Sequence, residues 1–147
     1  MKRFAALLLI ALAPPALAED QALASVFEQA ESPDLSQFLW TKRPVVVFAD
    51  SPFDPAFTEQ IDLLKARAQE LEERDVIVLT DTDPATLSDL RRQLRPRGFM
   101  LVLIGKDGDV KLRKPFPWDV RALSRAIDKM PIRQQEIRRA KEAAASE

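Results

Sequence analysis

The stretch "FMLVLIGKDGDVKLRKPF", residues 99–116, determines which fold this sequence predicts. Its first seven residues are apolar or glycine, which is typical of a strand buried on both faces. Residues 109–113 then alternate, so that Val110 and Leu112 are predicted to face the core and the basic side chains between them to face solvent. Between the two strands, residues 106–108 fit a three-residue hairpin turn whose glycine takes a left-handed conformation. The stretch therefore predicts two adjacent antiparallel strands.

Two further apolar runs lie upstream of this hairpin. "VVVFAD" at residues 45–50 and "VIVLT" at residues 76–80 are rich in β-branched side chains and predict two more buried strands. Asp54 and Pro55 are typical of a helix start, and apolar side chains recur every three or four positions after them. This spacing predicts one helix between the two strands. Two strands that are joined by a helix are expected to lie parallel, with a right-handed crossover.

Three more helices are expected around these strands. Ser32 and Pro33 are typical of a cap and a first helical position, which predicts a short helix that carries Leu35, Phe38 and Leu39. A second helix is expected from Asp83-Pro84, with Leu87, Leu90 and Leu94 on one face, and Pro96 should end it. A last helix carries Val120, Leu123, Ile127 and Met130, and Pro131 should interrupt it.

The order of elements after the first short helix is β-α-β-α-β-β-α. Three fully apolar strands and one alternating strand indicate a four-stranded mixed sheet flanked by helices, with the alternating strand at an edge. This is the thioredoxin-like arrangement, in which the first and third strands lie in the centre. A flavodoxin-like fold shares the beginning but would need another crossover helix where this sequence has the hairpin.

The first eighteen residues are typical of a secretory signal peptide. Lys2 and Arg3 precede an apolar run, and Ala16-Leu17-Ala18 provides small residues at the expected cleavage site. The run is too short for a membrane span, so the sequence predicts cleavage after Ala18, a periplasmic or secreted location, and no membrane span in the mature chain. Residues 19–31 are then a loosely packed lead-in, 32–131 the thioredoxin-like domain and 132–147 a charged tail that is expected to fray.

The composition limits the possible chemistry. The 147 residues include 22 basic and 23 acidic ones, and no basic stripe is interleaved with aromatic residues, so nucleic-acid binding is not expected. The chain has neither cysteine nor histidine, and therefore lacks the thiol nucleophile, the commonest general base and the soft metal ligands. We therefore expect no cofactor.

Four segments of the sequence resemble a known family when they are taken together. They are "FLWTKRPVVVFA", "ERDVIVL", "LIGKDGDVKLR" and "IDKMPIRQQE", spread over residues 35–136. In this order they resemble the bacterial domain-of-unknown-function 4174 family, which is similar to the peroxiredoxin-like domain of secreted sushi-repeat and matrix proteins. The resemblance implies a thioredoxin-like fold and export, without an established activity.

The sequence departs from active thioredoxins and peroxiredoxins where their chemistry takes place. Those enzymes place a thiol after the first strand, near the start of a helix, where the helix dipole stabilises the thiolate. Here this segment is Asp50-Ser51-Pro52-Phe53-Asp54-Pro55. The proline that commonly precedes the third strand is also missing, because this chain has Arg97-Gly98-Phe99 there. The sequence therefore excludes thiol–disulfide exchange.

Carboxylates near the ends of the first two strands suggest a second possibility. Asp50, Asp54, Asp81 and Asp83 would gather at one edge of the sheet, where oxygen ligands can hold a divalent metal. The simpler interpretation is that Asp54 and Asp83 each cap a helix ahead of a proline. The metal-dependent enzyme therefore remains the alternative hypothesis, and no metal ligand is assigned.

Six residues are candidates for contact with a partner. They are Lys106, Asp107 and Lys111 of the hairpin, Arg133 and Glu136 after the last helix, and Trp118. Turn geometry explains Asp107, but it does not require lysine at positions 106 and 111. Arg133 and Glu136 form a solvated helical pair, or Arg133 instead anchors an acidic group that is internal or belongs to a partner.

The preferred hypothesis is an exported, non-catalytic domain that binds a protein or an envelope component. A third hypothesis is a stability or scavenging protein without a specific site, whose surface would lack any pocket or apolar patch. The sequence leaves the oligomeric state open.

Overall fold

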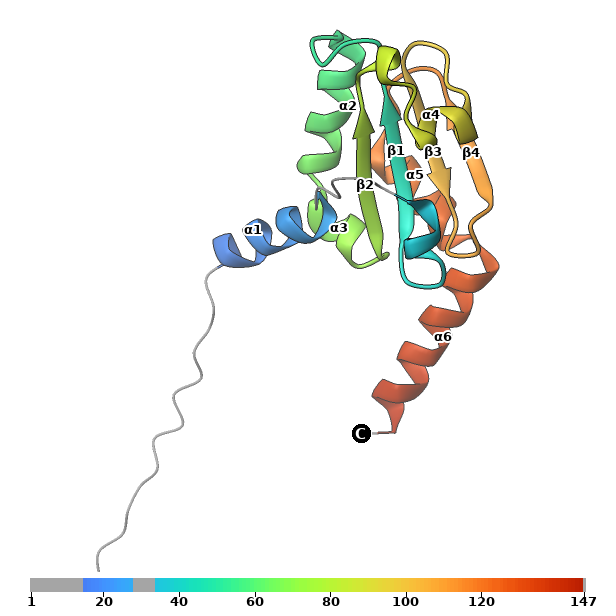
Figure 1. The fold of residues 1–147 in the computed structure, drawn as a ribbon. Coiled ribbons are helices and arrows are strands. Elements are labelled where there is room, and N and C mark those ends of the chain that lie inside the picture. Colours follow the sequence, from blue (N-terminus) through green and yellow to red (C-terminus); the bar gives the residue numbers. More distant parts are fainter. Residues whose placement is uncertain (1–14, 28–33, 147) are drawn as a thin grey trace, which may run out of the picture.

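A computed structural model describes residues 15–27 and 34–146 (Figure 1). The predicted signal sequence up to residue 14, and the predicted Ser32 cap with Pro33, lie outside the described residues. Four strands form one sheet: β1 (Arg43–Phe48), β2 (Val76–Asp81), β3 (Met100–Ile104) and β4 (Val110–Lys114). Helices surround it: α1 (Pro15–Val26), the 3-10 helix η1 (Leu35–Phe38), α2 (Pro55–Lys65), α3 (Ala68–Glu72), the 3-10 helix η2 (Pro84–Thr86), α4 (Asp89–Leu94), α5 (Val120–Asp128) and α6 (Pro131–Ala145).

The sheet has the predicted mixed topology, with strand order β2-β1-β3-β4. β1 and β2 are parallel, whereas β3 is antiparallel to both β1 and β4. The first and third strands are central, as predicted, and β4 is at an edge. The connection from β2 to β3 also contains a helix, α4, but these two strands run in opposite directions. The expectation that a helix joins parallel strands therefore holds for β1 and β2 and not for β2 and β3. We call the end where β1 and β2 begin the lower end, and the end where they finish the upper end (Figure 1).

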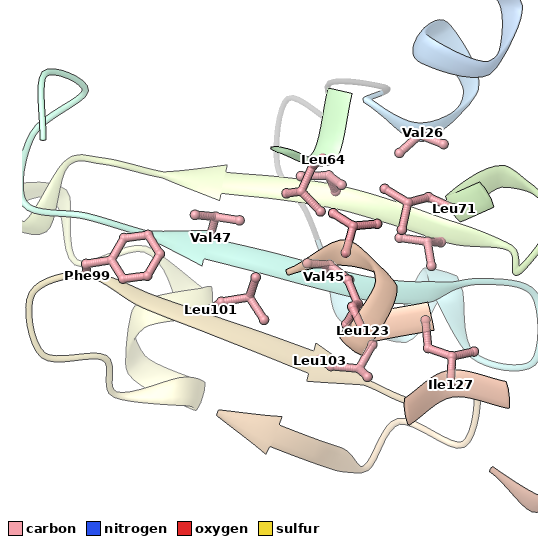
Figure 2. Packing of buried hydrophobic residues seen from close by; sticks show 13 residues of the cluster. Val26, Val45, Val47, Leu64, Leu71, Phe99, Leu101, Leu103, Leu123 and Ile127 are labelled. Atoms are coloured by element: carbon pink, nitrogen blue, oxygen red, sulfur yellow. The ribbon is translucent and has the colours of Figure 1, made fainter. Parts of the chain in front are cut away.

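Both faces of the sheet are covered, which explains why three strands are apolar throughout. Alternate residues of β1 point to opposite sides: Val45 and Val47 pack with α2, α3 and α5, and Val46 and Phe48 pack with η1 and α4. Figure 2 shows the first of these clusters, in which Leu64, Leu71, Leu123 and Ile127 approach the central strands. The two clusters fix the sheet between two helical layers.

Two of the predicted helices are broken. The single helix expected to start at Asp54-Pro55 is divided into α2 and α3, because Arg67 leaves the helical conformation at φ −130° and ψ 33°. This break lets α3 pack against α1 and β2, with Ala68 and Leu71 buried. The helix expected after Asp83 is interrupted at Leu87, which is left-handed and exposed, so its placement on the buried face was wrong. Leu90 and Leu94 are buried as predicted.

The edge strand β4 does not alternate as the sequence predicts. Val110 pairs with Ile104 and Leu112 with Leu103, so the register shifts by one residue at a bulge that leaves Lys111 without a partner on β3. Residues two apart share a face only in a regular strand, and the bulge turns Val110 away from Leu112. Val110 is 41% exposed, whereas Leu112 packs against the core, so the inward placement of Val110 was wrong.

Both ends of the described chain are helical. Helix α1 begins at Pro15 and includes residues 19–26 of the expected lead-in, and its Ala22 and Val26 are buried next to α3. The short helix η1 is capped by Asp34, whose side chain accepts a hydrogen bond from the Ser36 amide. The charged tail continues as α6, which extends from the lower end of the sheet (Figure 1).

The hairpin glycine offers a first test of the fold. Gly108 has φ +83°, as predicted, and a Cβ there would lie 2.8 Å from Leu39 Cδ2. We expect Gly108→Ala to lower the free energy of unfolding by about 2 kcal/mol, from left-handed strain and this contact. Gly98→Ala is the matched control, because φ is +58° but a Cβ would meet nothing within 4 Å. Chemical denaturation should show the smaller loss for the control, and equal losses would contradict the contact with Leu39.

Candidate functional site

Charged side chains from four parts of the chain converge at the lower end of the sheet. Arg43, the first residue of β1, is 1% exposed. Its Nη1 donates to the Arg74 carbonyl oxygen at 2.8 Å, and its Nη2 donates to Glu136 Oε1 at 3.0 Å. The Arg43 guanidinium therefore ties β1 to the turn before β2 and to α6.

Glu136 is the centre of this network. Its Oε1 also accepts from Lys106 Nζ at 2.7 Å, and its Oε2 accepts from Arg133 Nη1 at 3.3 Å. Lys106 Nζ makes a second contact of 2.7 Å with Asp75 Oδ2. One carboxylate thus contacts three cations, and it joins α6 to the hairpin and to the start of β1.

A second carboxylate extends the network to α5. Arg74 donates to both carboxylate oxygens of Asp128, from Nε at 3.0 Å and from Nη2 at 2.8 Å. Arg133 Nε lies 3.4 Å from the same Asp128. Paired oxygens facing a guanidinium are a strong and directional arrangement. Of the predicted residues, the structure brings together Lys106, Arg133 and Glu136. Arg133 forms the helical pair with Glu136 and also contacts an internal acidic group, Asp128.

A small pocket opens beside this network. It has a volume of about 120 Å³ and lies between the hairpin and the junction of α5 with α6. Its lining consists of Arg43, Gly105, Lys106, Asp107, Lys111, Met130, Pro131 and Ile132. Lys111 Nζ donates to Asp107 Oδ2 at 2.7 Å, and this hydrogen bond holds the pKa of Asp107 below its usual range. Two more predicted residues, Asp107 and Lys111, therefore line one pocket together with Lys106.

An exposed tryptophan lies at the same end of the sheet. Trp40 is 67% exposed and left-handed, with φ +63°, which is uncommon for any residue other than glycine. Its amide donates to the Lys106 carbonyl oxygen at 2.7 Å, so the strained turn is fastened to the hairpin. A large aromatic surface is thus held in solvent next to the charged network.

Trp118, the sixth candidate, belongs to another part of the molecule. Its side chain packs against the core, and the Lys114 ammonium lies 4.6 Å from the ring centroid. Gln60 of α2 fixes its backbone through two hydrogen bonds of 3.1 and 2.7 Å. Lys114 pairs with Leu101, at the far end of β4 from the hairpin, so Trp118 does not join the lower-end network.

The upper end, where a thioredoxin would carry its thiol, is closed by a buried ion pair. Arg91 is 8% exposed, and its Nε donates to Asp81 Oδ1 at 2.8 Å. Its Nη2 donates to the carbonyl oxygens of Ala49 and Asp81, at 2.7 and 3.1 Å. The guanidinium also lies 5.4 Å from the Phe48 ring centroid. This pair occupies the strand ends at which open α/β sheets bind ligands.

The carboxylates of the metal hypothesis are used elsewhere. Asp54 caps α2 through the Ala56 amide, and Asp83 caps η2 through the Ala85 amide. Asp81 is bound by Arg91 and by the Ser88 hydroxyl, and Asp50 is exposed. Within residues 15–27 and 34–146, no three potential ligands are close enough to hold a metal ion. The geometry therefore does not support the metal-dependent enzyme.

The network makes stability depend on pH. Burial raises the pKa of Glu136, but hydrogen bonds and charges from Lys106 and Arg43 outweigh it, so this pKa lies below its usual range. The pKa of Asp128 is also below its usual range, because burial raises it by less than Arg74 and Arg133 lower it. A carboxyl whose pKa is lower in the folded state binds fewer protons there than in the unfolded chain. The contribution of such a carboxyl to the free energy of unfolding is therefore complete at a pH above its pKa in the unfolded chain. It is lost as the pH falls through its pKa in the folded state.

We expect the free energy of unfolding to fall as the pH is lowered below about 4.5, near the ordinary carboxyl range. Urea denaturation at a series of pH values measures this dependence. Glu136→Gln should show a shallower decrease over the same interval, because one of the shifted carboxyls is gone. An unchanged slope in this variant would show that Glu136 keeps an ordinary pKa.

Four members of this network could not be predicted from the sequence: Arg43, Arg74, Asp75 and Asp128. Arg43 and Glu136 are 93 positions apart, and nothing in the local pattern joins them. The one local signal is that Arg43 directly precedes the apolar run that starts after Pro44. A charged side chain at the start of a buried strand lies at the end of the sheet, and when it is buried it needs a partner there.

Comparison with known proteins agrees with this fold. The sequence profile of a family described as a domain of unknown function, DUF4174, matches residues 34–136. Coiled-coil domain-containing protein 80 of Danio rerio is 32% identical over an alignment of 133 residues, which covers 70% of this chain. The chain spans only 15% of the length of that relative.

Among the described residues, no helix has the length and apolar character needed to cross a membrane.

Two solved structures share the fold. Thioredoxin peroxidase I of Plasmodium yoelii aligns with a TM-score of 0.56 and 17% identity, over 69% of this chain and 79% of its own. Chloroplastic thioredoxin z aligns with a TM-score of 0.50 and 20% identity, over 76% of this chain and 87% of its own. At these identities the likeness establishes the thioredoxin-like fold alone. The profile match over most of the chain shows that this protein belongs to the DUF4174 domain family.

Proposed function

We propose that this chain is an exported, non-catalytic thioredoxin-like domain that binds a protein or an envelope component through the lower end of its sheet. Export rests on the predicted signal peptide with cleavage after Ala18, and it places the domain in the periplasm or outside the cell. The absence of cysteine leaves the scaffold without the atom that carries its usual electron transfer.

One observation carries the proposal: the lower end holds a pocket lined by a buried arginine and two lysines, and an exposed, left-handed Trp40 at the same end. Aromatic and arginine side chains are enriched where proteins recognise partners. A scavenging protein without a specific site would need a surface without such features. At the upper end, the strand ends are occupied by the Arg91–Asp81 pair.

A pull-down with a matched pair of variants tests this proposal. Purified chain is immobilised and exposed to periplasmic or envelope extract of cells that produce it, and the bound material is identified by mass spectrometry. We expect Trp40→Ser to lose the bound component. Phe53→Ser is the control, because Phe53 is 87% exposed but lies at the upper end, after β1.

The proposal fails if the native chain recovers nothing beyond what an empty support recovers. It also fails if the Trp40 variant retains the partner while the Phe53 variant loses it, since contact would then take place at the upper end. Circular dichroism on both variants confirms that each is folded before it is used.

A further inference from the structure

We propose that the lower-end pocket binds a carboxylate group, presented by an acidic side chain of a protein partner. This inference rests on the proposed binding function and names the chemistry that the site would recognise. It is drawn from the polar groups that face the pocket, from its charge and from its size.

The first step is an unused donor on a buried cation. Both terminal nitrogens of Arg43 are hydrogen-bonded, to the Arg74 carbonyl and to Glu136, but its Nε has no partner among the described residues. Arg43 is 1% exposed and forms part of the pocket lining. A buried N–H without an acceptor is unfavourable, so an oxygen that approached this edge of the Arg43 side chain would gain by accepting from it.

The second step is the charge of the lining. Arg43, Lys106 and Lys111 are cationic, and Asp107 is the one anionic residue of the lining. An ammonium has three N–H donors. Lys106 Nζ uses two of them, on Asp75 and Glu136, and Lys111 Nζ uses one, on Asp107. Both lysines therefore retain donors for an anionic oxygen, although the carboxylates of Glu136, Asp75 and Asp107 already pair with the lining cations.

The third step is shape. A volume of about 120 Å³ is far below the 300 Å³ or more of a typical cofactor site. It is equivalent to about four water molecules. The lining combines the charged residues Arg43, Lys106, Asp107 and Lys111 with the apolar residues Met130, Pro131 and Ile132. A carboxylate on a short alkyl stem matches both kinds of lining residue, whereas a phosphate ion would leave the apolar residues without a partner.

Nuclear magnetic resonance on the ¹⁵N-labelled full chain tests this inference, with sodium propionate as the probe. The resonances to follow are the Arg43 Nε–H, which burial protects from rapid exchange, and the amides of Gly105 and Ile132. Propionamide has the same shape without the charge, and inorganic phosphate has the charge without the stem. All titrations are made at matched ionic strength, because exposed charges are screened by salt.

We expect propionate to shift the Arg43 Nε–H saturably in the millimolar range, and propionamide to leave it unchanged. Ile132→Phe should weaken this binding at least tenfold by filling the pocket. Ile137→Phe is the matched control, since Ile137 is half-buried on the same helix but does not line the pocket. Gly105→Ala is a second variant, because a Cβ there would lie 2.5 Å from Lys111 Cε and 2.6 Å from Asp107 Oδ1.

The inference is overturned if propionate leaves the Arg43 signal unchanged, if phosphate binds more tightly than propionate, or if folded Ile132 and Gly105 variants both bind as the native chain does. The pull-down separates this from the proposed function. If a partner is recovered in a Trp40-dependent manner but propionate does not bind, the carboxylate site is rejected and the binding function stands. If propionate binds but no partner is recovered, the site stands and the proposed function is rejected.

Discussion

Replacing Glu136 with glutamine is expected to lower the free energy of unfolding by about 3 kcal/mol, although the two side chains have almost the same shape. The carboxylate contacts Arg43, Lys106 and Arg133, at 3.0, 2.7 and 3.3 Å. An amide keeps one acceptor oxygen but removes the negative charge from among three cations. Arg43 is fully buried and cannot move into solvent, so its charge would be left undercompensated.

Equilibrium unfolding in urea measures this loss, and Glu142→Gln provides the control. Glu142 lies on the same helix α6, is exposed, and makes no ion pair within the described part of the chain. Its replacement should change stability by less than about 0.5 kcal/mol, as is usual for surface positions. A loss below about 1 kcal/mol for Glu136→Gln would show that the network is solvated like an ordinary surface pair.

Replacing Arg91 with methionine is expected to cost about 4 kcal/mol, the largest effect predicted at the upper end. The guanidinium contacts Asp81 at 2.8 Å and the Ala49 carbonyl at 2.7 Å, and it is 8% exposed. Methionine fills a similar volume, but it leaves the largely buried Asp81 carboxylate without its cation and a buried carbonyl without its donor.

A double variant separates the ion pair from simple packing. Combining Arg91→Met with Asp81→Asn removes both charges, and the Asn side chain can still accept from the Ser88 hydroxyl. We therefore expect the double variant to be more stable than Arg91→Met alone, when both are measured by chemical denaturation. Strictly additive losses would show that the two charges do not depend on each other.

The fold could be predicted largely from local patterns. Unbroken apolar runs predicted the buried strands, and the Lys106-Asp107-Gly108 turn predicted the hairpin, whose glycine is left-handed at φ +83°. The errors lie where tertiary packing overrides a local repeat. Arg67 breaks a helix so that Leu71 can pack, and the bulge at Lys111 exposes Val110. No proline or glycine lies at Arg67 or Lys111 to indicate the helix break or the bulge in the sequence.

The candidate site could be predicted only in part. Turn geometry does not require lysine at positions 106 and 111, and the structure places both side chains in the lining of the lower-end pocket. Arg43 could not be found in this way, because it pairs with Glu136 across 93 positions of sequence. Only its residue type suggests Trp118 as a contact residue, because nothing in the sequence places it near the other candidates. In the structure it packs on the core near Gln60.

Site-specific photo-cross-linking in cells that produce the chain tests most directly whether it acts by contact at the lower end. A benzophenone amino acid replaces Trp40 in one strain and Phe53 in another, so that two exposed aromatic positions at opposite ends are compared. We predict a discrete adduct from position 40 and none from position 53. Adducts from position 53 alone, or from neither position, would contradict a binding role for the lower end.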